Sequence, residues 1–430
     1  MNVLLIGSGG REHALAWKAA QSALVETVFV APGNGGTALE NKVENVDLAV
    51  DDFAALADFA LKNNCGLTIV GPEAPLVDGI VDHFQALGLK IFGPRRGAAQ
   101  LEGSKTFTKH FLARHHIPTA AYQTFTELDQ ALAYIREQGA PIVIKADGLA
   151  AGKGVIVAMN LDEAEAAVND MLAGNAFGEA GHRVVIEEFL EGEEASFIVI
   201  ADGVHVQPMA TSQDHKRVGD GDTGANTGGM GAYSPAPVVT DAVYQRIMDE
   251  VILPTIRGMA AEGNPYTGFL YAGLMIAADG APKVIEYNCR FGDPETQPIM
   301  MRLQSDLVAL CLAALDGGLE TKVPKWDERC ALGVVMAAGG YPGAYDKGAD
   351  ISGLGNDTEA TKVFHAGTQI RDGAVATNGG RVLCITALGD TVSEAQARAY
   401  QAVEQISWRD AYYRKDIGYR AIAREQGNRE

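Results

Sequence analysis

The chain has 430 residues, of which 47% are hydrophobic and 21% are charged, and its 55 acidic and 35 basic side chains give a formal net charge of −20. A chain of this length can form several domains with large cores, and its excess of negative charge argues against binding to nucleic acid. No apolar run approaches the roughly 20 residues of a membrane span, and no signal-peptide pattern opens the sequence, so we expect a cytoplasmic protein with no membrane partner. The 5 cysteines show no metal-binding spacing and are expected to be free thiols.

Residues 1–100 alternate short apolar runs with helical stretches. The runs VLLI, TVFVA, LTIVGP and LKIFGP each lead into glycine or proline, a pattern that predicts a parallel sheet with ligands at the carboxyl ends of its strands. The segment GSKTFTKHFLARHHIP then predicts a helix that Ser104 caps and that ends before Pro118.

The rest of the chain mixes helices and strands around glycine-rich loops, and a final long helix is predicted to start near Thr391. We therefore expect a multidomain protein of α/β and α+β parts. Its parts would be an N-terminal parallel α/β domain (1–103), a connecting helix (104–120), a small mobile subdomain (121–190), a large subdomain with metal and substrate loops (191–325) and a small C-terminal α+β domain (326–430).

The stretch GSGGREHA, Gly7 to Ala14, follows the first predicted strand as a dinucleotide-binding turn would. The fingerprint G-x-G-x-x-G fails at its third glycine, where Glu12 stands, and Ala31 and Pro32 occupy the place of the acid that holds a ribose. An NAD(P) oxidoreductase is therefore disfavoured. A turn with free backbone N–H groups at a helix N-terminus, together with Arg11, suits a single phosphate group.

A second glycine loop lies in IVIKADGLAAGKGVIVAM. It is not a P-loop, because Gly154 follows Lys153 and a strand rather than a helix comes next. A strand, a glycine loop and a second strand form a flap that can close over phosphates with its N–H groups and Lys153. Lys145 ends an apolar strand, where a charge is costly unless it meets an anion.

The segment KVIEYNCRFGDPETQP places Glu286 and Asn288 on one face of a predicted strand. A carboxylate and an amide oxygen side by side suit Mg²⁺ that nucleotide phosphates also hold. Arg290 follows two residues later. A nucleotide, Mg²⁺ and a phosphate flap without a side-chain nucleophile indicate phosphoryl transfer to a substrate by positioning and charge stabilisation.

A series of motifs runs through the chain in order: GSGGREHA, APGNGGT, TIVGPEAPLVDGI, IFGP, KADGLAAGKGV, SQDHKRVGDGDTGANTGGMGAY, GFLYAGLMI, EYNCRFGDPETQP, GGYPG, KVFHAGT, NGGRVL and YRKDIGYRA. By these motifs the chain resembles the phosphoribosylamine–glycine ligase (glycinamide ribonucleotide synthetase) family of the ATP-grasp superfamily. The resemblance implies an ATP-grasp fold with a Rossmann-like N-terminal domain. It also implies a ligase of de novo purine biosynthesis, in which ATP converts glycine to glycyl phosphate and the amine of 5-phosphoribosylamine attacks it, giving glycinamide ribonucleotide, ADP and phosphate.

The resemblance implies roles for individual residues. ATP would be bound by Lys105, Lys145, Gly152, Lys153, Gly154, Glu187, Glu188, Phe189, Leu190 and either Glu193 or Glu194. Glycine and the acyl phosphate would be held by the catalytic residues Arg290, Asp214, Lys216 and Asp293. The remaining substrate contacts would come from Gly9, Gly10, Arg11, Glu73, His215, Asn226, Gly228 and Gly229, and Mg²⁺ or Mn²⁺ would be bound by Glu286 and Asn288.

The strand GLMIA lacks the further carboxylate that many ATP-grasp enzymes carry, so a second tightly bound metal is not expected unless Asp279 or a residue elsewhere supplies a ligand. The expected partners are ATP, glycine and phosphoribosylamine, with transient contacts to neighbouring purine-pathway enzymes, in a monomer or small homo-oligomer. The alternatives are another ATP-grasp carboxylate–amine ligase or carboxylase, an NAD(P) oxidoreductase and a non-catalytic nucleotide sensor.

Overall fold

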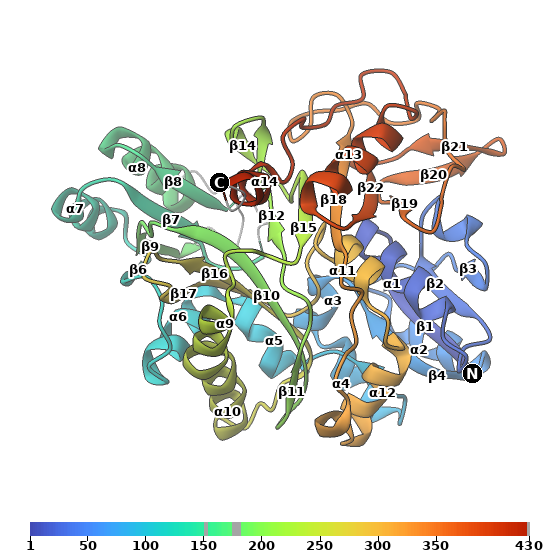
Figure 1. Cartoon of the computed structure of the whole chain (residues 1–430). Coiled ribbons are helices and arrows are strands. Elements are labelled where there is room, and N and C mark those ends of the chain that lie inside the picture. Colours follow the sequence, from blue (N-terminus) through green and yellow to red (C-terminus); the bar gives the residue numbers. More distant parts are fainter. Residues whose placement is uncertain (150–153, 174–181, 428–430) are drawn as a thin grey trace.

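The computed structural model describes residues 1–149, 154–173 and 182–427 (Figure 1). Within this part of the chain an N-terminal domain, a central region of two sheets and a C-terminal domain surround a common centre (Figure 1). The cysteines are free thiols, as predicted. No helix among the described residues is both long enough and apolar enough to span a membrane.

The N-terminal domain is built on a parallel sheet with the strand order β3-β2-β1-β4-β5. The prediction of a parallel sheet is confirmed. Val3 to Ile6 of the central strand are all 0% exposed, because helices cover both faces of a sheet of this kind. The elements are β1 Asn2–Gly7, α1 Gly10–Ala20, β2 Val28–Pro32, β3 Val43–Asn45, α2 Phe53–Lys62, β4 Cys65–Val70, α3 Glu73–Asp78, α4 Ile80–Ala86 and β5 Ile91–Phe92.

Two helices, α5 (Arg96–Gly103) and α6 (Lys105–Arg114), lead from this domain to the centre. Ser104 caps α6, since its Oγ accepts a hydrogen bond from the backbone N–H of Phe107 at 3.1 Å. The predicted helix and its cap are confirmed.

The small sheet at the left of Figure 1 has the antiparallel order β6-β9-β7-β8 and is covered by α7 and α8. Its apolar side chains, among them Ile135, Ile144 and Ile186, form a core of their own. A unit with its own core can move as one body relative to the rest of the chain. The elements are β6 Tyr122–Phe125, α7 Leu128–Gln138, β7 Ile142–Ala146, β8 Val155–Ala158, α8 Leu161–Val168, a π-helical turn Asn169–Ala173 and β9 Val184–Glu188.

The large sheet has the antiparallel order β11-β10-β16-β17. Its apolar residues continue into the core of the N-terminal domain, so the two parts share one packed interior. The elements are β10 Glu193–Asp202, β11 Val206–Pro208, α9 Asp241–Ile247, the π-helical turn Met248–Ile252, α10 Leu253–Ala261, β16 Thr267–Ile276, β17 Pro282–Asn288, α11 Thr296–Arg302 and α12 Leu307–Asp316.

The C-terminal sheet has the antiparallel order β12-β15-β18-β22-β19. Strands β12 and β15 come from the segment 191–325, so this sheet joins that segment to the C-terminal domain. Thr391 caps α13, as predicted. The elements are β12 Gln213–Asp214, β13 Arg217–Gly219, β14 Thr223–Asn226, β15 Gly231–Ser234, β18 Cys330–Ala337, β19 Thr361–His365, β20 Thr368–Arg371, β21 Ala374–Thr377, β22 Arg381–Gly389, α13 Val392–Val403 and α14 Tyr419–Gly427.

A buried polar cluster docks the C-terminal domain on the N-terminal domain. Nδ1 of His13 accepts the backbone N–H of His365 at 2.7 Å, and Nε2 lies 3.0 Å from Oε1 of Glu40. Burial lowers the pKa of His13, so the neutral imidazole donates from Nε2 to Glu40. The carboxylate of Glu40 also pairs with Lys362, which Asp357 contacts at 2.9 Å.

Candidate active site

The central sheets, the N-terminal domain and the C-terminal domain together enclose a cavity of about 490 Å³. Most of the residues that the sequence marked as functional line this one cavity, although they come from distant parts of the chain. They are Arg11, Glu73, Lys105, Lys145, Gly154, Glu187, Glu188, Phe189, Leu190, Glu194, Asp214, Lys216, Asn226, Gly228, Glu286, Asn288, Arg290 and Asp293.

Buried lysines mark one wall of the cavity. The carboxylate of Glu187 lies 3.0 Å from Nζ of Lys145 and 2.8 Å from Nζ of Lys109. Nζ of Lys145 also donates to the carbonyl oxygen of Ile285 at 2.9 Å, and Nζ of Lys105 donates to that of Gly148 at 2.8 Å. Burial lowers the pKa of Lys105, and the nearby Lys145 lowers it further. Cations held in this way gain from meeting an anion, which is what nucleotide phosphates supply.

The expected metal ligands Glu286 and Asn288 lie on β17 and face the cavity. Burial alone would raise the pKa of Glu286, but the charges of Lys216 and Lys145 outweigh burial and lower it, so the carboxylate is ionised. Among the described residues its oxygens form no hydrogen bond or ion pair, whereas Oδ1 of Asn288 accepts from Arg290 at 3.0 Å. A free carboxylate beside an amide oxygen fits a hard cation such as Mg²⁺.

A fully protein-built metal cage is not present in the part of the chain that the structure describes, where no group of three or more His, Cys, Asp or Glu side chains converges. Asp279, considered as a further ligand, lies exposed in the turn between β16 and β17 and does not line the cavity. A cation bound here would therefore need phosphate oxygens or water to complete its coordination.

Arg290 lies between acidic side chains. Its Nε lies 3.1 Å from Glu73 and its Nη2 3.2 Å from Glu102. Burial raises the pKa of Glu102 to about 7, although Arg290 favours its ionised form. The partly buried guanidinium is thus fixed in place at the cavity wall, where it can pair with the planar carboxylate of a substrate.

Further acidic and basic side chains lie close together around β12. Nζ of Lys216 pairs with Glu194 at 2.8 Å. Burial raises the pKa of Asp214 to about 8. The positive charge of Lys216 works to lower this pKa, and the negative charge of Glu295 works to raise it. Glu194 lines the cavity, whereas Glu193 lies on the opposite face of β10 and pairs with Arg424 at 2.8 Å.

Several sequence-predicted residues lie apart from this cavity. His215 points toward the C-terminal domain, where its Nε2 accepts the backbone N–H of Gly418 at 2.9 Å and its ring packs against Tyr233 and Tyr419. It does not line the cavity, and these contacts join it to the C-terminal segment, so contact between His215 and substrate stays a prediction that the cavity lining does not support. Gly10, Glu193 and Gly229 also do not line the cavity. Gly152 and Lys153 lie outside the described residues.

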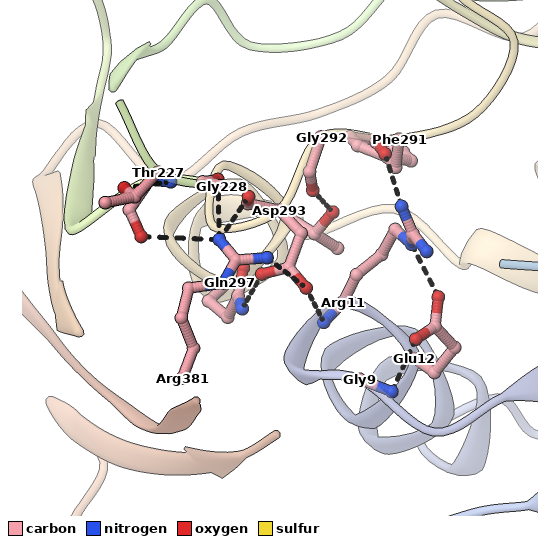
Figure 2. Close-up of polar contacts among 12 residues, drawn as sticks. Gly9, Arg11, Glu12, Thr227, Gly228, Phe291, Gly292, Asp293, Gln297 and Arg381 are labelled. Atoms are coloured by element: carbon pink, nitrogen blue, oxygen red, sulfur yellow. Dashed lines mark hydrogen bonds and ion pairs between the residues drawn. The ribbon is translucent and has the colours of Figure 1, made fainter. Parts of the chain in front are cut away.

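The opening turn holds an anion of its own. The carboxylate of Glu12 accepts the backbone N–H of Gly9 at 2.6 Å and pairs with Nε of Arg11 (Figure 2). A Cβ on Gly7 or Gly71 would lie 2.4 Å or 2.1 Å from an atom of the Glu12 side chain, so glycine is required at both positions. Glu12 thus fills the space before the helix, which is a physical reason why a pyrophosphate does not fit there.

A second cavity, of about 640 Å³, lies between the N-terminal domain and the C-terminal domain. Among the described residues, Asp293 and Arg381 line both cavities. The second cavity is otherwise lined by uncharged residues, which are Ser8, Gly9, Pro32, Gly33, Asn34, Ala38, Asn45, Tyr341, Ala366, Gly367, Thr368, Gln369, Ile370 and Asn378.

Sequence reasoning missed four charged residues of the site: Glu102, Lys109, Glu295 and Arg381. Lys109 is four residues after Lys105 on the same helix, a spacing that could have pointed to it. Arg381 lies in the NGGRVL motif, to which no role had been given.

The fold and the site define this chain as an ATP-grasp protein. The biotin carboxylase domain of Hydrogenobacter thermophilus 2-oxoglutarate carboxylase, solved with MgADP and bicarbonate, superimposes with a TM-score of 0.72 over 96% of this chain and 91% of that chain. At 16% identity this likeness shows the fold alone.

Models of the phosphoribosylglycinamide synthetase N domain, ATP-grasp (A) domain and C domain match residues 1–102, 103–296 and 331–420. The chain belongs to this family. It is 72% identical to the phosphoribosylamine–glycine ligase of Vibrio vulnificus strain CMCP6 over 427 residues, which are 99% of this chain and 100% of that protein. The same enzyme of Escherichia coli K12 is 72% identical over 428 residues, again 99% of this chain and 100% of that protein.

The crystal structure of the Thermotoga maritima phosphoribosylamine–glycine ligase is 34% identical, with a TM-score of 0.84 over 97% of this chain and all of that chain. The resemblance and the fold class predicted from the sequence are therefore confirmed. The division of the middle region into 121–190 and 191–325 stays a prediction.

Proposed function

We propose that the chain is an ATP-dependent ligase that joins glycine to 5-phospho-D-ribosylamine through glycyl phosphate, giving glycinamide ribonucleotide, ADP and phosphate in purine biosynthesis. The observation that carries this proposal is the meeting of two cavities. The first combines phosphate-binding lysines, a candidate metal pair and a fixed arginine, and the second opens beside it with room for the amine substrate.

The nucleotide would bind between the small and large sheets. Lys105 and Lys145 would face the phosphates, while the backbone of Glu187 to Leu190, which ends β9 and continues beyond it, would line the adenine end. Glu194 takes the ribose hydroxyls, because its carboxylate faces the cavity and that of Glu193 does not. Gly152 and Lys153, which lie outside the described residues, would also contact the phosphates.

Mg²⁺ or Mn²⁺ bound by Glu286 and Asn288 would neutralise phosphate charge. The chain's own residues position glycine. Arg290 offers a fixed guanidinium to the glycine carboxylate, and Asp214 offers an oxygen to the ammonium group. Lys216 lies beside Asp214 and stabilises the negative charge that develops as the γ-phosphoryl group reaches the carboxylate oxygen.

The amine substrate would enter through the second cavity. Gly9 lines that cavity, and Arg11 and Glu73 line the first cavity, where the backbone N–H of Arg11 lies 3.5 Å from Oδ2 of Asp293. Asn226, at the end of β14, and Gly228, in the glycine-rich loop that joins β14 to β15, also line the first cavity. This arrangement brings a nucleophile from one side and an activated acyl group from the other, which is what acyl transfer without a covalent enzyme intermediate requires.

The intermediate can be tested with hydroxylamine, which converts an acyl phosphate to a hydroxamate. We expect glycine hydroxamate to form only when ATP, a divalent cation and glycine are all present. ADP release without hydroxamate would refute the acyl phosphate route. Hydroxamate formed from another carboxylic acid but not from glycine would favour a different carboxylate–amine ligase.

We further infer that the protein acts in the cytoplasm as a monomer or small homo-oligomer and touches neighbouring purine-pathway enzymes transiently. The absence of a membrane-spanning helix among the described residues agrees with this setting. Sedimentation equilibrium of the purified protein measures the oligomeric state.

A further inference from the structure

Arg381 is the first residue of β22 and reaches from the C-terminal domain to the junction of the two cavities. Its Nη1 donates to the carbonyl oxygens of Gly228 at 2.6 Å and of Asp293 at 2.7 Å. Its Nη2 lies 3.4 Å from Oδ2 of Asp293. Figure 2 shows the guanidinium between Gly228 and Asp293, so that it ties the glycine-rich loop to the segment that carries the carboxylate.

The Asp293 carboxylate is held from three parts of the chain. Nε2 of Gln297, on α11, donates to Oδ1 at 2.9 Å, and the backbone N–H of Arg11 lies 3.5 Å from Oδ2 (Figure 2). Burial alone would raise the pKa of Asp293, but the charges of Arg381 and Arg11 lower it. Asp293 is therefore an ionised hydrogen-bond acceptor in a fixed position.

Two glycines, Gly228 and Gly229, leave room for the guanidinium of Arg381 and for the segment that carries Asp293. A Cβ on Gly228 would lie 2.9 Å from Cζ of Arg381, and a Cβ on Gly229 would lie 2.4 Å from Cδ of Pro294. Side chains at either position would push the guanidinium or the Asp293 segment aside. The paired glycines of TGGMG thus permit the close approach of Arg381 to the loop backbone.

We propose that Arg381 is a positioning residue for the second half of the reaction, where it holds Asp293 as the acceptor for the attacking amine. This inference rests on the proposed function. Asp293 is suited to the role because it is the carboxylate, among the described residues, that faces both the acyl phosphate in the first cavity and the amine arriving from the second.

The amine nitrogen bonds to the carbonyl carbon of glycyl phosphate, and the bond from that carbon to the phosphate oxygen breaks, so phosphate leaves with the electron pair. The nitrogen becomes strongly acidic as the bond forms, and its proton passes to Asp293. The released phosphate then takes the proton from Asp293, which restores the carboxylate.

The test compares the two half-reactions in Arg381→Gln. Hydroxylamine is a small, strong nucleophile that needs no positioning, so the rate of glycine hydroxamate formation reports the first half. We expect this rate to stay within about 3-fold of the wild type, while kcat for glycinamide ribonucleotide falls about 10²-fold or more. Guanidinium ions added to Arg381→Ala should restore part of the lost kcat, because they can occupy the space left by the side chain.

Arg371→Gln is a matched control, because Arg371 is an arginine of the same domain that pairs with Asp350 at 2.9 Å and lines neither cavity. It should leave both rates unchanged. Equal losses of both rates in Arg381→Gln, or a higher KM for phosphoribosylamine at unchanged kcat, would overturn the inference. An active wild type with an unaffected Arg381→Gln would overturn the inference alone, whereas a wild type that forms neither hydroxamate nor ribonucleotide would overturn the proposed function as well.

Discussion

Replacement of Glu40 by glutamine tests how the C-terminal domain is held on the N-terminal domain. Burial alone would raise the pKa of Glu40, but His13 and Lys362 lower it from 4.5 to about 2. That difference is equivalent to about 3.4 kcal/mol in favour of the ionised form. Because the side chain is 16% exposed, solvent screening reduces the expected loss to about 2 kcal/mol. The amide keeps an oxygen that can accept a hydrogen bond from His13 or Lys362, so the loss reports mainly the charge.

The folded state holds Glu40 ionised at a lower pH than the unfolded chain does, so its stabilisation is complete above about pH 4.5 and declines toward pH 2. At neutral pH we expect the midpoint of thermal unfolding to fall by about 2–5 °C in Glu40→Gln, and the difference from wild type to shrink below about pH 4.5. Asp357→Asn is the control, because Asp357 contacts the same Lys362 with a side chain that is 39% exposed. An equal loss in the control, or a loss in Glu40→Gln that does not shrink between pH 5 and pH 3, would refute the reasoning.

Three further predictions concern the site. Glu286→Gln should lower kcat/KM for the metal–ATP complex by about 10²–10³-fold and leave the unfolding midpoint unchanged. Asp279→Asn, in the exposed turn of the same hairpin, should have no effect. Near-normal turnover in Glu286→Gln would rule out a metal-binding role for Glu286. Glu194→Gln should raise the KM for ATP about 10-fold and Glu193→Gln should not, whereas the reverse order would assign the ribose to Glu193. His215→Phe should lower the unfolding midpoint, because the Gly418 N–H loses its acceptor. It should leave the KM of each substrate within about 2-fold of the wild type. A selective rise in one KM would show that His215 contacts that substrate.

Local patterns were sufficient for much of the fold. The run VLLI is apolar on both faces, which is typical of a central parallel strand, and it forms one. Ser104 was recognised as a cap because the helix signal begins directly after it. The pairing of Glu286 with Asn288 followed from the two-residue period of a strand, and both side chains face the cavity.

Contacts between residues far apart in the sequence could not be predicted from such local patterns. Arg381 meets the backbone of Asp293 across 88 residues of sequence. Strand β12 has only 2 residues, too few to show an alternating pattern, so its pairing across to the C-terminal sheet was not foreseen. Glu193 and Glu194 are neighbours on opposite faces of one strand, and only the position of the cavity distinguishes them.

Glu12 shows how a local rule can mislead. The sequence alone places Glu12 where a dinucleotide turn has its third glycine, and it predicts that the free N–H groups of this turn meet a substrate phosphate. The structure shows that the Glu12 carboxylate itself accepts the Gly9 N–H and pairs with Arg11. The departure from the fingerprint is therefore a structural feature, since a helix N-terminus favours a negative charge of any origin.

The central claim is that this chain uses ATP to join glycine to phosphoribosylamine. The most direct measurement is ADP release by the purified protein with phosphoribosylamine formed in place from ribose 5-phosphate and ammonia. We predict ADP and glycinamide ribonucleotide in equal amounts when ATP, a divalent cation, glycine and the amine are all supplied, and no ribonucleotide when any one is omitted. Turnover with bicarbonate or another acid in place of glycine, and none with glycine, would contradict the account.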